Sequence, residues 1–70
     1  MSNLQILQNG TKNEQLFANA ITSFARSQGF YGRLIQNVND LDCWGLDDLK
    51  EELEKQNFES TLDVVLWLEC

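Results

Sequence analysis

Residues 11–25 read TKNEQLFANAITSFA and carry the clearest helical signal in the chain. Thr11 and Glu14 have the spacing of a capping box, in which the hydroxyl accepts a hydrogen bond from the backbone N–H three residues later. A helix is therefore expected to begin near residue 12 and to end at Gly29, with Arg26 in its last turn. Its apolar side chains recur every three or four residues and form one stripe: Phe17, Ala20, Ile21, Phe24 and Ala25.

A second helical segment is expected over residues 30–37. Its apolar residues keep the same spacing and are Tyr31, Leu34, Ile35 and Val38. Gly32 lies inside this segment, where glycine weakens a helix by about 0.5–1 kcal/mol relative to alanine. Either another backbone packs closely against Gly32, or the helix begins later than residue 30. The pattern equally allows one bent helix over residues 12–38.

Most acidic residues of the chain gather in a third predicted helix. Residues 37–45 are expected to form a polar connector that contains Leu41 and Trp44, and the helix is expected to run from near Leu46 to Asn57. One face carries Leu46, Leu49 and Leu53, and the opposite face carries Asp47, Asp48, Glu51, Glu52 and Glu54. The two aspartates would lie in the first turn, where negative charge is favourable. Lys55 is placed to pair with Glu51.

The last segment, residues 62–68, reads LDVVLWL and is apolar on nearly every side of a helix. Such a segment has to be covered by the domain core or by a second molecule. A strand is the alternative because Val64 and Val65 favour β-structure. The helix is preferred because Ser60 and Asp63 have capping spacing and because no second strand is available. The candidate contacts for a homodimer are Val64, Trp67 and Leu68.

The fold class predicted from these elements is all-α, a small bundle of three to four short helices. Residues 1–70 are expected to form a single helical domain, with residues 1–10 flexible or loosely packed. A chain of this length buries only about 60% of the surface that its unfolded form exposes, so self-association is one source of added stability. The expected core consists of Phe17, Ile21, Phe24, Tyr31, Leu34, Ile35, Val38, Leu46, Leu49, Leu53, Leu62, Val65 and Leu66.

Charge is separated along the chain. Residues 1–39 hold three basic residues and one acidic residue, a balance of +2, whereas residues 40–70 hold ten acidic and two basic residues, a balance of −8. The net charge of −6 opposes direct binding to nucleic acid or to an anionic membrane, because both require basic side chains. The negative electric field of the second half of the chain favours a basic protein surface as the partner.

The N-terminal residues lack the basic residues and the long apolar core of a signal peptide, and no stretch approaches the roughly 18 apolar residues of a membrane-spanning helix. A cytoplasmic location is therefore expected. In that compartment Cys43 and Cys70 are expected to be free thiols, with a disulfide between them as the alternative.

Catalytic chemistry has little support in the composition. The chain contains no histidine, and two cysteines alone cannot complete a four-ligand zinc site. The aspartates between residues 40 and 48 lack the glycine and the alternating spacing of an EF-hand loop. We therefore expect a protein that is not an enzyme, with no catalytic residue, no metal site and no cofactor.

Two surface groups are candidates for partner binding. The acidic face formed by Asp47, Asp48, Glu51, Glu52 and Glu54 would either imitate the phosphates of nucleic acid and occupy a basic groove, or only keep the domain in solution. Like-charge pairs at i,i+4, such as Asp47 with Glu51, cost a few tenths of a kcal/mol and favour the first interpretation.

The second group consists of Arg26, Tyr31 and Arg33, near a glycine-flanked turn. It would form a contact patch for a phosphate or an acidic partner. Alternatively, its aromatic residue belongs to the core and its two bases cap a helix end or pair internally with the acidic helix. The alternative is preferred because a fold of this size needs its aromatic residues inside.

Three segments carry a resemblance: residues 14–20 (EQLFANA), 27–34 (SQGFYGRL) and 61–69 (TLDVVLWLE). They resemble short acidic proteins carried by phages and conjugative mobile elements of Gram-positive bacteria. The resemblance implies a setting in which small acidic proteins inhibit host defence nucleases, and it implies no catalytic residues. The expected function is therefore binding to a basic protein surface. The alternative is a structural module that self-associates through its C-terminal segment.

Overall fold

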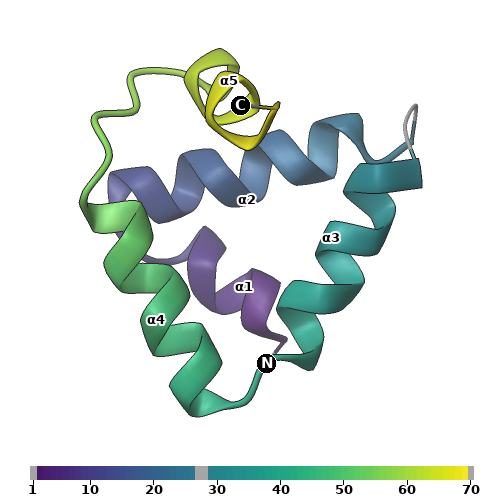
Figure 1. Ribbon diagram of the computed structural model, residues 1–70, viewed down its shortest axis with the longest axis vertical. Coiled ribbons are helices and arrows are strands. Elements are labelled where there is room, and N and C mark those ends of the chain that lie inside the picture. The colour runs from purple at the N-terminus through teal and green to yellow at the C-terminus, as the bar shows by residue number, and fades with distance from the viewer. Residues whose placement is uncertain (1, 27–28, 70) are drawn as a thin grey trace.

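Helix α2 (Lys12–Phe24) crosses the middle of the molecule and contacts the other four helices. Figure 1 shows the computed structural model, which describes residues 2–26 and 29–69. Helix α5 lies across one side of α2, while α1 lies on the other side, flanked by α3 and α4. The remaining helices are α1 (Asn3–Gln8), α3 (Gly29–Asp40), α4 (Cys43–Glu54) and α5 (Thr61–Glu69).

The all-α prediction is confirmed, since the described residues contain helices and no strand. They form five helices instead of three or four, because residues 3–8 are also helical. Ser2 caps α1: its hydroxyl accepts the Gln5 N–H, and Gln5 Oε1 accepts the Ser2 N–H, both at 3.2 Å. Leu7 is fully buried. Within the segment expected to be flexible or loosely packed, residues 3–8 thus form a helix that packs into the core.

Helix α2 begins where the capping signal predicts. The Thr11 hydroxyl accepts the Glu14 N–H at 3.3 Å. The helix ends at Phe24, however, and Gly29 is the first residue of α3. The prediction that Gly29 ends the helix is therefore wrong. Phe24, the last residue of α2, packs against Tyr31 of α3 with ring centroids 5.6 Å apart.

Residues 12–38 form two helices, which excludes the single bent helix. Gly32 lies within α3, because this helix begins at Gly29 and not later. A Cβ atom added at Gly32 would lie 4.0 Å from the Ala25 carbonyl oxygen, an ordinary van der Waals distance. No close approach of another backbone therefore requires a glycine at this position.

Helix α4 begins at Cys43, three residues before the predicted start. Asp42 is the N-cap, and its Oδ1 accepts the Gly45 N–H at 2.7 Å. Trp44 consequently lies on the helix instead of in a connector, and Asp47 lies beyond the first turn. The helix ends at Glu54, before the predicted end at Asn57.

The C-terminal segment is a helix, as preferred over the strand. Val64 is fully buried, and Trp67 makes edge-to-face contacts with Phe17 and Phe58 at centroid distances of 6.3 and 5.7 Å. Asp63 Oδ2 accepts the Glu59 N–H at 2.9 Å, which fixes the chain as it enters α5.

The predicted core is correct in its centre and wrong on α5. Six of its members are buried, namely Phe17, Ile21, Tyr31, Val38, Leu46 and Leu53, and four pack against them partly buried, namely Phe24, Leu34, Ile35 and Leu49. Leu62 and Leu66 are instead 63% and 57% exposed, and Val65 is only partly buried and outside the core cluster. Val64 faces the core, and residues two positions away on a helix point about 160° away from it. Leu7, Phe58 and Val64, which were not predicted to be core residues, are buried.

Two asparagine side chains join helix starts to helix ends. Asn13 Nδ2 donates to the carbonyl oxygens of Leu53 at 2.8 Å and Gln56 at 2.7 Å, at the end of α4. Asn3 Nδ2 donates in the same way to Val38 and Leu41, both at 2.8 Å, at the end of α3. The last carbonyls of a helix have no intrahelical partner, so these bonds satisfy groups that would otherwise need water.

Replacing Asn13 by alanine removes both bonds that hold the start of α2 to the end of α4. We expect Asn13→Ala to lower the free energy of unfolding by about 1–3 kcal/mol. The measurement is urea unfolding followed by circular dichroism. Asn19→Ala is the matched control, because Asn19 is an exposed residue on the same helix. Equal stability of the two variants would contradict a clamping role for Asn13.

Candidate functional site

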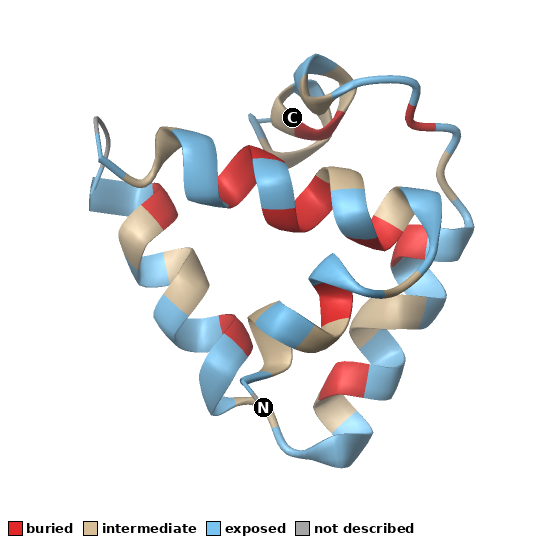
Figure 2. Ribbon diagram, turned by 180° about the vertical axis from the view of Figure 1, so that it is seen from behind, coloured by how far each residue is buried: buried red, intermediate tan, exposed pale blue. Residues whose placement is uncertain are grey.

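The acidic face of α4, defined as Asp47, Asp48, Glu51, Glu52 and Glu54, lies opposite the buried leucines of the same helix. Leu53 is fully buried and Leu46 is 7% exposed, whereas all five acidic residues are exposed. At 3.6 residues per turn the five carboxylates span about 160° of the helix circumference. Figure 2 shows exposed residues alternating with buried ones along α4. The acidic residues are thus gathered on one outward side.

Few basic groups compensate this charge. Lys55 Nζ lies 3.2 Å from Glu52 Oε1, with both side chains more than half exposed. The predicted pair between Lys55 and Glu51 is not formed. In the part of the chain that the structure describes, the side chains of Asp47, Asp48 and Glu51 make no hydrogen bond or ion pair. Their charges therefore face the solvent.

Glu54 differs from the other four because it is tied to the start of α2. Thr11 Oγ1 donates to Glu54 Oε1 at 2.6 Å, and the same hydroxyl lies 2.9 Å from Glu14 Oε2. The hydrogen bond from Thr11, and then one with Glu14, lower the pKa of Glu54. Glu14 itself is only 5% exposed. This end of the acidic face consequently belongs partly to the α2–α4 contact.

The second predicted group is divided by the structure. Tyr31 is 1% exposed, and its ring packs against those of Phe24 and Phe30. The preferred alternative is therefore correct for Tyr31, which belongs to the core. Arg26 and Arg33 are exposed, and neither forms an ion pair with a described acidic residue. Of the two roles expected for these arginines, capping a helix end or pairing internally with the acidic helix, the second is therefore not formed in the described residues.

The predicted oligomer contacts also point inward. Val64 is fully buried, and Trp67 and Leu68 pack partly buried against the core. The apolar side chains that α5 presents to solvent are instead Leu62 and Leu66, one helical turn apart. A surface for self-association on α5 would therefore consist of these two leucines.

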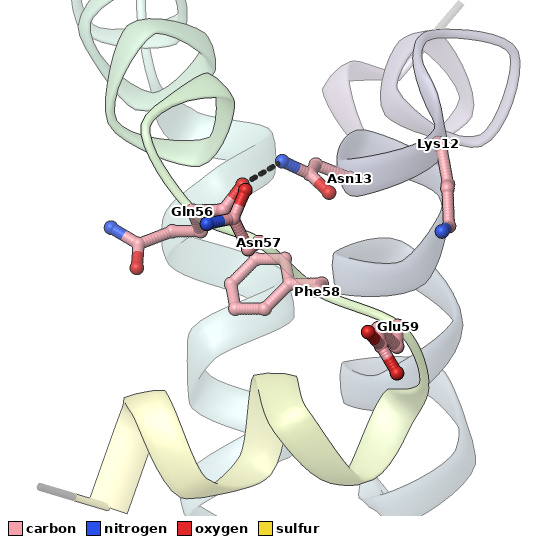
Figure 3. A pocket seen from close by; sticks show the side chains of 6 residues that line it. All are labelled: Lys12, Asn13, Gln56, Asn57, Phe58 and Glu59. Atoms are coloured by element: carbon pink, nitrogen blue, oxygen red, sulfur yellow. Dashed lines mark hydrogen bonds between the residues drawn. The ribbon is translucent and has the colours of Figure 1, made fainter.

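A shallow hollow of about 510 Å³ lies where the start of α2 meets the connector between α4 and α5 (Figure 3). It is lined by Lys12, Asn13, Gln56, Asn57, Phe58 and Glu59. The Asn13 amide is already engaged by backbone carbonyls, and Phe58 is buried. Only Lys12 and Glu59 bring charge to this hollow, so it does not collect groups that could perform acid–base or nucleophilic chemistry.

The described residues also lack a cluster of metal-ligating side chains. No group of three or more histidine, cysteine, aspartate or glutamate side chains there could hold a metal ion. Cys43 is an exposed free thiol, and Cys70 lies outside the described residues.

Besides Leu62 and Leu66, a further surface residue was not predicted: Trp44 is 77% exposed on the same helix as the acidic face. The signal available in the sequence was Asp42. Its side chain caps the N–H of Gly45, so the helix begins three residues earlier than predicted.

Comparison with protein-family models, with curated proteins and with solved structures found no match to this chain. In the described residues, none of the helices combines the length and the apolar character that crossing a membrane requires.

The hydroxyl of Tyr31 donates to Glu69 Oε1 at 3.3 Å. Burial, followed by the negative charge of Glu69 and this hydrogen bond, raises the pKa of Tyr31. A raised value means that the fold favours the neutral phenol. Its contribution to stability is therefore complete below the ordinary tyrosine pKa of about 10 and is lost as the pH rises through the higher folded value.

Tyr31 is the only tyrosine in the chain, so tyrosinate absorbance reports on it alone. We expect its titration in the folded protein to lie above that of free tyrosine. Glu69→Gln should lower the midpoint only in part, because burial is the larger cause. A midpoint equal to that of free tyrosine would contradict the burial of the hydroxyl.

Proposed function

We propose that this protein is a non-enzymatic binding protein whose acidic face docks on a basic surface of another protein. The observation that supports this proposal is the exposure of Asp47, Asp48 and Glu51 without a partner in the described residues. Like charges at i,i+4 destabilise a helix slightly. A partner that supplies lysine or arginine side chains would relieve this repulsion.

The distribution of charge over the molecule favours an oriented encounter. Arg33 lies on α3, and α3 and α4 flank α1 from opposite sides (Figure 1). The protein is thus most negative on the α4 side. Such an asymmetric field speeds the approach of a basic partner and turns one face toward it.

The sharpest form of the proposal is imitation of nucleic acid. Five carboxylates between residues 47 and 54 occupy about 10 Å of helix axis, or one charge per roughly 2 Å. Duplex DNA carries one charge per about 1.7 Å of its axis. This similarity, together with the resemblance to small acidic proteins of mobile elements, supports inhibition of a host nuclease through its basic groove.

The proposal is tested by reversing one negative charge, either on the acidic face or outside it. Glu51→Lys and Glu59→Lys each change the net charge from −6 to −4, but only Glu51 lies on the acidic face. We expect proteins captured from a Gram-positive bacterial lysate by the wild type to be retained by Glu59→Lys and lost by Glu51→Lys, at least tenfold by quantitative mass spectrometry. Helical circular dichroism should stay unchanged in both variants.

Either of two results would contradict the proposal. If the three proteins capture the same set, or if the wild type captures no protein above the level of an uncoated resin, the acidic face is not a binding surface. Sensitivity of the capture to salt supports the proposal further, because exposed charge pairs are screened.

A second candidate function is assembly through self-association. The observation in its favour is the exposed pair of Leu62 and Leu66 on one side of α5. Burying these two leucine side chains between two molecules would contribute about 1–2 kcal/mol for each of them, because each is already partly covered.

Sedimentation velocity at micromolar concentration tests this second candidate. If it holds, we expect a dimer that resists high salt, and Leu66→Gln should convert it to a monomer. Phe30→Gln is the matched control, because Phe30 is an apolar residue with similar exposure on α3. A wild-type monomer at these concentrations would exclude assembly through α5.

A further inference from the structure

Trp44 is the most exposed of the large apolar side chains, with 77% of its surface accessible. Each of the other six aromatic residues packs against a second aromatic ring. They are Phe17, Phe24, Phe30, Tyr31, Phe58 and Trp67. Trp44 makes no such contact in the described part of the chain. Its indole ring therefore adds little to the core and is available to a partner.

Trp44 lies on the same side of α4 as the acidic face. Asp47 and Asp48 follow it by three and four residues, and Glu51 follows by seven, spacings that place side chains on the same side of a helix. At 100° per residue Trp44 lies within the arc occupied by the acidic face, close to its centre. An exposed indole thus lies on the same side of α4 as three carboxylates, all of them toward the C-terminal end of the helix, that have no partner of their own in the described residues.

An exposed indole ring on the same helix side as free carboxylates suits an arginine side chain of a partner better than any other side chain. The face of an indole attracts a cation, and among side chains guanidinium groups take this position most often. A guanidinium group also binds carboxylates through two parallel hydrogen bonds, which an ammonium group cannot do. A purely apolar partner would have to bury the surrounding carboxylates without compensation, which is unfavourable.

We infer that Trp44 is the anchor of the acidic face and receives an arginine side chain of the partner, stacked on the indole and hydrogen-bonded to neighbouring carboxylates. This inference rests on the proposed function, because it names the chemistry of the partner at the same surface. It predicts a preference for arginine over lysine that is larger than the acidic residues alone would produce.

The test uses two synthetic alanine-based peptides of equal length and equal charge, one carrying arginine and the other lysine. Isothermal titration calorimetry at low salt measures their dissociation constants. We expect the wild type to bind the arginine peptide several-fold more tightly than the lysine peptide. The ratio should be smaller than the roughly 3- to 30-fold of a complete cation–π contact, because lysine also forms such a contact. Trp44→Ala should reduce this preference to the part that the carboxylates alone produce, and Trp44→Phe should reduce it less.

Control variants separate this inference from the proposed function. Phe30→Ala removes an exposed aromatic ring from α3 and should leave both affinities unchanged. Glu51→Lys should weaken binding of both peptides. Because Trp44 is exposed, Trp44→Ala should unfold at the same urea concentration as the wild type.

Two results would overturn the inference, and they differ in what they say about the acidic face. If the wild type binds both peptides equally and Trp44→Ala changes neither affinity, Trp44 is not an anchor, while the acidic face remains a binding surface. If the wild type binds neither peptide, the proposed function fails together with the inference.

Discussion

Burial of one side of α2 is the constraint on which the whole structure depends. The other four helices are short, and helices of this length are marginal in water without tertiary packing. Each of them packs against α2, where Phe17, Ala18, Ala20 and Ile21 are at most 1% exposed. The two asparagine clamps then fix the ends of α3 and α4 against the starts of α1 and α2. Hydrophobic burial thus holds the helices together, while specific hydrogen bonds fix their ends.

The same arrangement leaves the functional surface open. Helix α4 uses its leucine side to reach α2, so its acidic face has to remain in water. Because Asp42 caps the helix three residues earlier than expected, Trp44 joins this face instead of a loop. The cap is therefore the local feature that connects folding to the proposed binding chemistry: it adds an aromatic ring to a row of carboxylates.

Sequence reasoning succeeded where a local pattern had a single physical meaning. The capping signal at Thr11 located the start of α2, and the spacing of leucines and acids located both faces of α4. It failed where several local solutions were similar in energy. Gly29 can end one helix or begin the next. On α5 almost every side chain is apolar, so periodicity could not show that Val64 faces α2 while Leu62 and Leu66 face solvent.

The sequence by itself determined the all-α class, the centre of the core and the concentration of negative charge in the second half of the chain, because these properties follow from composition and from spacing along one helix. Only the tertiary structure decided that residues 3–8 form a packed helix, that Leu62 and Leu66 face solvent, that the arginines stay apart from the acidic face and that Trp44 stands within it. These outcomes depend on which side each helix turns toward α2. That choice is made by competition among all five helices for one buried surface, which no single segment encodes.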